Sequence, residues 1–191
     1  MKRRVAVLDA CVLHPAPLRD LLLRLAMTEI YRARWSEAIH DEWMRSILQR
    51  RPDITVERLE RTRRLMDASV PDSLVALADR HQPRRSMSRG LPDPDDEHVL
   101  AAAVHGGAEV IVTYNLDDFP AAVLQPHGVT AEHPDTFLCG LLRLSPLAFI
   151  DTVRKQQCAL RNPPRTMDEL LITLDDLGLV QTVAELRRVS S

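Results

Sequence analysis

Short apolar runs alternate along the chain with longer segments in which apolar residues recur every three or four positions. Residues 5–8 and 109–114 form the two clearest runs. The first is β-branched at two positions, as is typical of a strand buried within a parallel sheet. Residues 129–131 predict a further short strand. Helical spacing of apolar residues predicts helices at 18–27, 37–49, 56–68, 72–81, 95–105, 120–124 and 135–142.

Capping residues and breakers support this division. Ser36 is expected to cap the helix that follows it, and Asp53 or Thr55 is expected to cap the next one. Residues 82–90 are polar and contain a proline, so we expect an exposed loop there.

The pattern changes after about residue 144. Ser145 and Pro146 place a capping residue before a proline in the first helical position, and they predict a helix to about residue 160. A capping box at 166–169 opens a second helix, and a third helical segment follows it. The expected organisation is a main domain and a small helical C-terminal extension, at 1–144 and 145–191.

Strands that alternate with helices predict an α/β fold with a central, mostly parallel sheet. At 191 residues, one compact domain with an appendage is the default. Apolar residues make up 45% of the chain but aromatic residues only 4%, so the core must consist mainly of Leu, Ala and Val. In such sheets ligands bind beyond the carboxyl ends of the strands.

Charge is nearly balanced overall but uneven along the chain. With 27 acidic residues against 25 Lys and Arg, the net charge of −2 argues against general binding of polyanions. Arginines cluster at 45–64 and 80–89. Arg can hold phosphates in a fork geometry, so the arginines at 45–64 are candidates for holding a nucleic-acid backbone. The alternative is a solvated helix face in a protein whose genome favours Arg over Lys.

The three cysteines are scattered and form no metal-binding pair, which predicts reduced thiols in a cytoplasmic protein. The first apolar run, at 5–8, is too short for a signal peptide or a membrane span, so we expect neither.

Polar side chains follow both clear strands directly. Asp9 ends the first run, where an acid is costly if it is buried alone. Asn115, Asp117 and Asp118 follow the second run, and Thr113 lies in the same turn. Because the carboxyl ends of parallel strands meet at one edge of the sheet, these groups are expected to lie close together.

Two acids on helices are further candidates. Asp96 lies in the first turn of its helix, where the helix dipole alone would explain a carboxylate. It also precedes Val99, Leu100 and Ala103 at helical spacing, so it should point along the buried stripe. Glu42 lies at the border of the apolar face of its helix, although most glutamates in helices simply face water.

Acids that converge from four segments repel one another unless a cation lies between them, and oxygen-only donors suit Mg²⁺ or Mn²⁺. Such a site serves phosphodiester hydrolysis, because the metal polarises the phosphoryl oxygen and lowers the pKa of a bound water.

Other classes of protein fit the sequence less well. An aspartyl phosphatase needs an acid where Cys11 stands, a receiver domain needs a Lys after a later strand, and a dinucleotide-binding domain needs a Gly-rich turn after strand one.

Four segments together resemble the motifs of the PIN-domain family. Residues 5–13 are similar to the first motif, in which an apolar run ends in Asp and a small residue. Glu42 stands where the family places its second acid. Residues 96–103 are similar to the third motif, an Asp before an Ala-rich helix, and residues 112–120 to the fourth. The resemblance covers about residues 4–142.

This resemblance implies a three-layer α/β/α sandwich and a Mg²⁺- or Mn²⁺-dependent endoribonuclease, often the VapC-like toxin of a bacterial VapBC toxin–antitoxin pair. It also implies an RNA substrate, a small inhibitory antitoxin and a homodimer. Asp9 and Asp96 would bind the metal most directly. The implied site residues are the metal-binding acids Asp9, Glu42, Asp96 and Asp118, with Thr113 and Asn115 orienting their surroundings.

One departure from the family pattern affects this interpretation. Many members have Asp where Asn115 stands, so the fourth acidic role passes to Asp118 or to Asp117. A catalytically degenerate PIN domain that binds RNA or a protein partner is therefore the alternative, and a DNA nuclease of related architecture is a third possibility.

Overall fold

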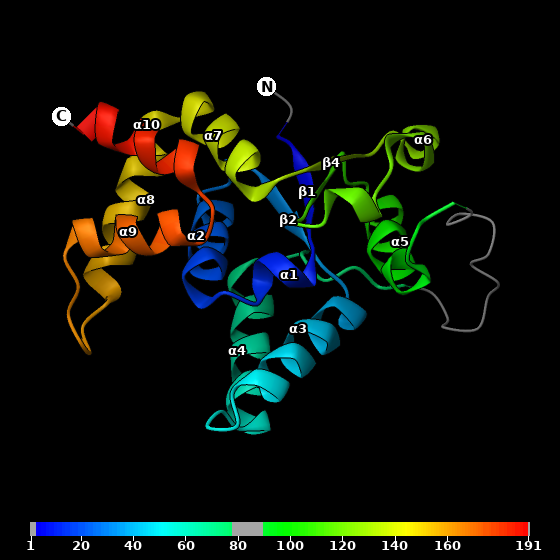
Figure 1. Ribbon diagram of the computed structural model, residues 1–191, viewed down its shortest axis with the longest axis horizontal. Helices are drawn as coiled ribbons and strands as arrows, with labels where there is room; N and C mark the ends of the chain where they lie inside the picture. The colour runs from blue at the N-terminus through cyan, green and yellow to red at the C-terminus, as the bar shows by residue number, and fades with distance from the viewer. Residues whose placement is uncertain (1–2, 78–89, 191) are drawn as a thin grey trace.

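A four-stranded parallel sheet forms the centre of the computed structural model, which describes residues 3–77 and 90–190 (Figure 1). The strand order is β2-β1-β3-β4, and each pair of neighbours is parallel. Their bounds are β1 (Val5–Leu8), β2 (Arg32–Arg34), β3 (Val110–Val112) and β4 (Thr130–Glu132). The three strands expected from the sequence are confirmed. No apolar pattern indicated β2, because only Ala33 of its three residues is fully buried and arginines flank it.

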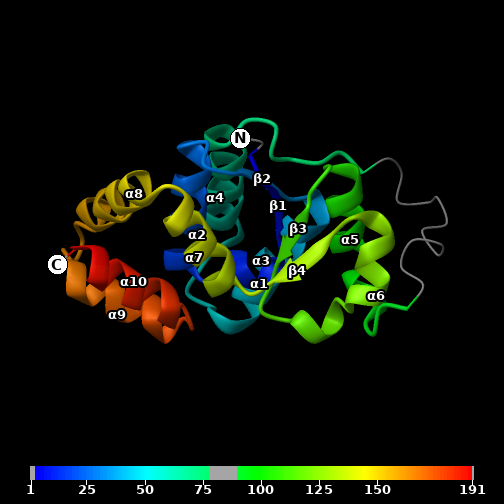
Figure 2. The same ribbon diagram turned by 90° about the horizontal axis from the view of Figure 1, so that it is seen from above.

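Helices connect the strands and cover the sheet on both sides, so the expected α/β sandwich is confirmed. Figure 2 shows α5 and α6 on one side of the sheet and α2, α4 and α7 on the other. The helix bounds are α1 (Ala10–Leu13), α2 (Ala16–Met27), α3 (Glu37–Arg50), α4 (Val56–Ser69), α5 (Glu97–His105), α6 (Ala121–Leu124), α7 (Pro134–Leu144), α8 (Pro146–Ala159), α9 (Met167–Asp176) and α10 (Val180–Ser190). Short 3₁₀ turns are η2 (Pro94–Asp96), η3 (Leu116–Asp118) and η4 (Gln125–His127).

The helix predicted at 72–81 is wrong for the part that the structure describes. Asp72 has a φ of 61°, a left-handed conformation that does not belong in a helix. The chain then runs extended beside the end of β2, where Ser73 accepts a hydrogen bond from the backbone N–H of Trp35 and Val75 donates one back. Pairing with the sheet therefore overrides the helical pattern. The rest of that helix, most of the expected loop at 82–90 and the arginines at 80–89 lie outside the described residues.

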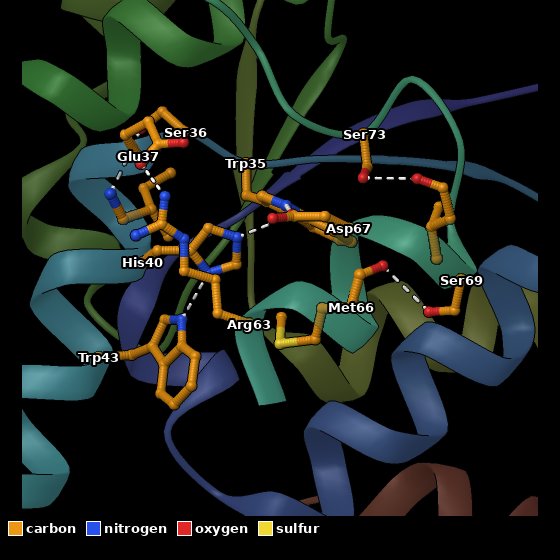
Figure 3. A network of polar contacts seen from close by, with 12 residues as sticks. Trp35, Ser36, Glu37, His40, Trp43, Arg63, Met66, Asp67, Ser69 and Ser73 are labelled. Atoms are coloured by element: carbon orange, nitrogen blue, oxygen red, sulfur yellow. Dashed lines mark hydrogen bonds and ion pairs between the residues drawn. The ribbon is translucent and has the colours of Figure 1, made fainter. Parts of the chain in front are cut away.

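A buried polar network fixes α3 against α4 (Figure 3). Trp35 Nε1 and His40 Nε2 both lie within hydrogen-bond distance of Asp67 Oδ1, at 2.8 and 3.0 Å. Trp43 Nε1 lies 3.0 Å from His40 Nδ1. An indole nitrogen can only donate, so His40 Nδ1 accepts and the proton of the neutral ring is on Nε2. Burial lowers the pKa of His40, in agreement with this neutral form. The network sets the orientation of the helix that carries Glu42.

The C-terminal helices pack against the rest of the protein rather than projecting from it. α8 packs along α2, and α7 packs against α10. The carboxylate of Asp135, near the start of α7, caps α10 by accepting the N–H groups of Gln181 and Thr182 at 2.9 and 2.8 Å. The predicted capping box is confirmed, since Thr166 and Glu169 bond each other's backbone N–H at the start of α9.

Among the described residues, no single helix is long and apolar enough to cross a membrane; α7 and α8 satisfy length and composition only when counted together, and they are bent by 119°. All three cysteines are free thiols in this structure.

Candidate active site

Asp9 is a buried carboxylate held by three donors at the junction of β1 and α1. Its side chain is 3% exposed. Oδ1 accepts the N–H of Ala10 at 2.6 Å, while Oδ2 accepts the hydroxyl of Thr113 at 2.7 Å and the thiol of Cys11 at 3.0 Å. Burial raises the pKa of Asp9, although the bonds from Thr113 and Cys11 oppose the shift. The protein therefore fixes the direction of this carboxylate while disfavouring its charge.

A pocket of about 940 Å³ is lined mainly by acidic and polar groups, and Asp9 itself is not among its lining residues. Its walls come from α3, from the extended segment 74–77, from η2 with the start of α5, and from η3. Of the predicted site residues, Glu42, Asn115, Asp96 and Asp118 line it. Thr113 lies behind the wall, where it is fully buried and bonded to Asp9.

Asp96 shows that these acids share one electrostatic environment. Its pKa is raised to about 7, first by burial and then by the charges of Asp9, Asp118, Asp93 and Glu42. All four charged groups that raise it are acids from different segments. Asp9 is therefore close enough to Asp96 for its charge to act on it, and the acids together create a concentration of negative charge that favours a cation.

The donor set suits a hard divalent cation, because it consists of carboxylate oxygens with an amide oxygen beside them. However, within residues 3–77 and 90–190 no three His, Cys, Asp or Glu side chains are arranged closely enough to hold a metal ion. The described residues thus fit Mg²⁺ in chemistry and charge, and metal binding requires the side chains to move inward or waters to bridge them.

Glu42 is paired with a histidine that the sequence analysis did not single out. His98 Nε2 lies 3.1 Å from Glu42 Oε2, an ion pair whose direction is poor for a hydrogen bond. His98 Nδ1 lies 2.6 Å from the carbonyl oxygen of Asp95. Burial lowers the pKa of His98, but the contacts with Glu42 and the Asp95 carbonyl, together with the charges of Glu42 and Asp9, outweigh burial and the net shift is upward. A cationic His98 at the pocket wall would neutralise part of the acidic charge.

The two candidates for the fourth acidic position differ in their surroundings. Asp118 lines the pocket and raises the pKa of Asp96, whereas Asp117 does neither. The N–H of Asn115 donates to Thr113 Oγ1 at 2.9 Å, which places the Asn115 side chain at the pocket wall next to the group that holds Asp9. The catalytic roles of these residues stay predictions.

The arginines at 45–64 contribute little to the lining of the pocket. Of the seven, all of them in the described part of the chain, Arg45 lines the pocket. Arg51 pairs with Asp53 at 2.7 Å, and Arg63 pairs with Glu37. Arg51 and Arg63 are therefore better described as paired with acidic side chains than as free to hold RNA.

Two contacts of the site had no usable signal in the sequence. Cys11 lies two residues after Asp9, but its thiol matters because Asp9, Thr113 and the N–H of Tyr114 surround it. His98 reads as one polar residue in an apolar helix, and its partner lies 56 residues earlier in the chain. Both depend on contacts between segments that only the fold brings together.

Comparison with known proteins shows the family of this chain. The model of the PIN domain family matches residues 5–117, more than half of the chain, so the chain belongs to the PIN-domain family. The model of the VapC50 C-terminal domain matches residues 134–188.

A protein of Mycobacterium tuberculosis (strain ATCC 25618 / H37Rv) named "Putative ribonuclease VapC50" is 43% identical over 94 residues. The matched region is 49% of this chain and 55% of that protein, so the chain spans about half the length of this relative. No solved structure matches the chain.

The raised pKa of Asp96 predicts how pH affects stability without metal. Between its ordinary value of 3.8 and about 7, the folded protein keeps a proton that the unfolded chain has released. Stability from this group therefore falls as pH rises to about 7, and the Asp96→Asn variant should lack that fall. Added Mn²⁺ should reverse the trend, because it binds the carboxylate form.

Thermal unfolding in EDTA from about pH 5 to about pH 8 measures this difference. Comparing wild type with Asp96→Asn removes the contribution of His40, whose lowered pKa acts in the opposite direction. Equal pH slopes in the two proteins would show that Asp96 does not carry the shift.

Proposed function

We propose that this protein is a divalent-metal-dependent endoribonuclease that hydrolyses RNA phosphodiester bonds as the toxin of a VapBC-type toxin–antitoxin pair. The observation that carries the proposal is the acidic pocket, in which burial and the charges of Asp9, Asp118, Asp93 and Glu42 raise the pKa of Asp96. Membership of the PIN-domain family and the relative named as a ribonuclease support it.

Each residue has a defined task in this proposal. Asp9 and Asp96 would hold Mg²⁺, or Mn²⁺, and Glu42 and Asp118 would complete the pocket, partly through metal-bound waters. When bound, the metal lowers the pKa of an attacking water and stabilises charge on the phosphoryl oxygens. A carboxylate that does not bind the metal directly can orient that water or accept its proton.

The surroundings of these acids act by orientation and by charge. Thr113 keeps Asp9 aimed by donating to Oδ2 at 2.7 Å, and Asn115 aligns the turn that holds Thr113. Arg45, at the pocket wall, is placed to neutralise a backbone phosphate of the RNA.

The remaining features of the proposal concern the whole protein. A small antitoxin would inhibit the enzyme, and two copies would form a homodimer in the cytoplasm. Residues 1–144 would carry the catalytic chemistry, and residues 145–191 would extend and support it.

Incubating the purified full-length protein with a structured RNA tests the central claim. Cleavage is expected with Mg²⁺ or Mn²⁺, and EDTA is expected to abolish it. Cleavage at the same rate in EDTA would contradict the metal-dependent mechanism. Cleavage of flapped DNA but not of RNA would instead favour a DNA nuclease.

Asn115 and the lack of a preformed metal cluster among the described residues favour one other function, a degenerate PIN domain that binds RNA or protein without cutting. Fluorescence anisotropy of labelled RNA would then show binding that does not depend on Mn²⁺, and electrophoresis would show intact RNA at every metal concentration.

A further inference from the structure

Tyr114 connects the candidate active site to the C-terminal helices. It lies between Thr113 and Asn115, two residues after the end of β3. Its hydroxyl donates a hydrogen bond of 2.7 Å to the carbonyl oxygen of Leu177, in the turn between α9 and α10. Its backbone N–H points the other way and donates to Cys11 Sγ at 3.3 Å. One residue therefore contacts both the C-terminal turn and a group that binds Asp9.

The contact with the C-terminal turn involves the ring of Tyr114 as well as its hydroxyl. The ring packs edge-to-face on His133, with centroids 5.1 Å apart and planes at 79°. A methyl group built on Gly178 would lie 3.9 Å from both rings, so the turn backbone lies against them. Gly178 has a φ of +83°, which favours glycine and lets the chain turn sharply there.

The turn is itself fixed from the other side. The Asp135 carboxylate, which is 4% exposed, accepts the N–H groups of Gln181 and Thr182 and the hydroxyl of Thr182, the last at 2.7 Å. These bonds tie the start of α10 to α7. The carbonyl of Leu177 is therefore a stationary acceptor, and the Tyr114 hydroxyl is anchored rather than resting on a free loop.

On the active-site side, a continuous series of hydrogen bonds leads from Tyr114 to Asp9. The thiol of Cys11, which accepts from Tyr114, donates to Asp9 Oδ2 at 3.0 Å. Thr113 donates to the same oxygen at 2.7 Å, and its hydroxyl accepts the N–H of Asn115 at 2.9 Å. A displacement of Tyr114 would therefore move two of the three donors that aim the Asp9 carboxylate.

We propose that Tyr114 is a positioning residue through which the α9–α10 turn holds the segment after β3, and with it Asp9, in the geometry required for metal binding. The C-terminal helices then act as a support of the active site. The effect on RNA cleavage rests on the proposed ribonuclease function, whereas the effects on Mn²⁺ binding and on amide exchange do not.

The Tyr114→Phe variant tests the inference because it removes the hydroxyl and keeps the ring that packs on His133. Tyr31→Phe is the matched control, since its hydroxyl also donates to a backbone carbonyl, that of Leu22 at 3.0 Å, but it lies in the core away from the pocket. Both variants lose the same kind of bond, and Tyr31 is the more deeply buried residue.

Tyr114→Phe is expected to weaken Mn²⁺ binding about 10-fold in calorimetric titration, as is typical when a group that orients a metal ligand is removed. It should lower kcat for RNA cleavage by about the same factor and leave KM unchanged. In EDTA, amide hydrogen exchange of residues 113–118 should be faster than in the wild type. Tyr31→Phe should lower the unfolding temperature without changing Mn²⁺ affinity, kcat or exchange at 113–118.

The outcomes separate the two claims. If the wild type binds Mn²⁺ but cleaves no RNA, the ribonuclease proposal fails. The role of Tyr114 is then still decided by comparing the wild type with Tyr114→Phe in Mn²⁺ affinity and in amide exchange at residues 113–118. Wild-type exchange and wild-type Mn²⁺ affinity in folded Tyr114→Phe overturn the inference. Equal losses of Mn²⁺ affinity and kcat in Tyr114→Phe and Tyr31→Phe also overturn the inference, because such losses would reflect reduced stability alone.

Discussion

Replacing Asp9 with asparagine is expected to lower RNA cleavage about 10³-fold, because a metal ligand contributes several kcal/mol to the transition state and each 1.36 kcal/mol is tenfold in rate. The same substitution should leave the metal-free protein at least as stable as the wild type. Burial raises the pKa of Asp9, so the fold already disfavours its charge, and a neutral amide of the same shape removes that cost.

The surroundings of Asp9 can accept an amide. Asparagine keeps one oxygen to accept the Ala10 N–H, and its NH₂ group can donate to the Thr113 hydroxyl or to Cys11 Sγ, both of which can also act as acceptors. We therefore expect the fold to remain intact, so that a loss of cleavage reports on chemistry. Unfolding temperature and cleavage rate, measured on the same preparation, separate the two effects.

Asp117→Asn is the matched control for Asp9→Asn. Asp117 is an acid from the same sheet edge that neither lines the pocket nor raises the pKa of Asp96. The Asp117→Asn variant should keep the wild-type cleavage rate, and Mn²⁺ should still raise its unfolding temperature. Mn²⁺ should not raise the unfolding temperature of Asp9→Asn. Full cleavage by folded Asp9→Asn would remove this residue from the mechanism.

The sequence was sufficient for the positions whose role depends on local pattern. Asp9 follows a buried strand, and the carboxyl ends of parallel strands meet at one edge of the sheet, so its location followed from the strand alone. The helical stripe that follows Asp96 is confirmed, since Val99, Leu100 and Ala103 are all fully buried. Asp93 rather than Asp96 accepts the capping hydrogen bond.

The sequence was insufficient where a residue's role depends on a distant partner. β2 has two arginines among its three residues and forms because β1 offers it hydrogen-bonding groups. Residues 72–77 belong to a segment with a helical pattern, but Asp72 is left-handed and pairing with Trp35 keeps residues 73–75 extended. His98 and Tyr114 acquire their roles from contacts 56 and 63 residues away in the chain. Short-range periodicity contains no information about such pairs.

Replacing Asp67 with alanine is expected to cause the largest loss of stability among single polar substitutions considered for this protein, about 3 kcal/mol. The substitution leaves Trp35 Nε1 and His40 Nε2 without their acceptor, and both side chains are fully buried. Each unsatisfied buried donor costs about 1–3 kcal/mol, and the partial exposure of Asp67 lets water satisfy some of that demand. Chemical denaturation measures the change directly.

Asp67→Asn distinguishes the need for an acceptor from the need for a charge. His40 is neutral, because its Nδ1 accepts from Trp43 and burial lowers its pKa, so its contact with Asp67 is a hydrogen bond to an oxygen rather than an ion pair. The amide oxygen of asparagine can still accept from both rings. We therefore expect Asp67→Asn to lose less than half as much stability as Asp67→Ala, and Asp53→Ala, at an exposed pair with Arg51, to lose none. Equal losses for the two Asp67 variants would mean that the negative charge itself stabilises α3 against α4, and that His40 is protonated in the folded protein.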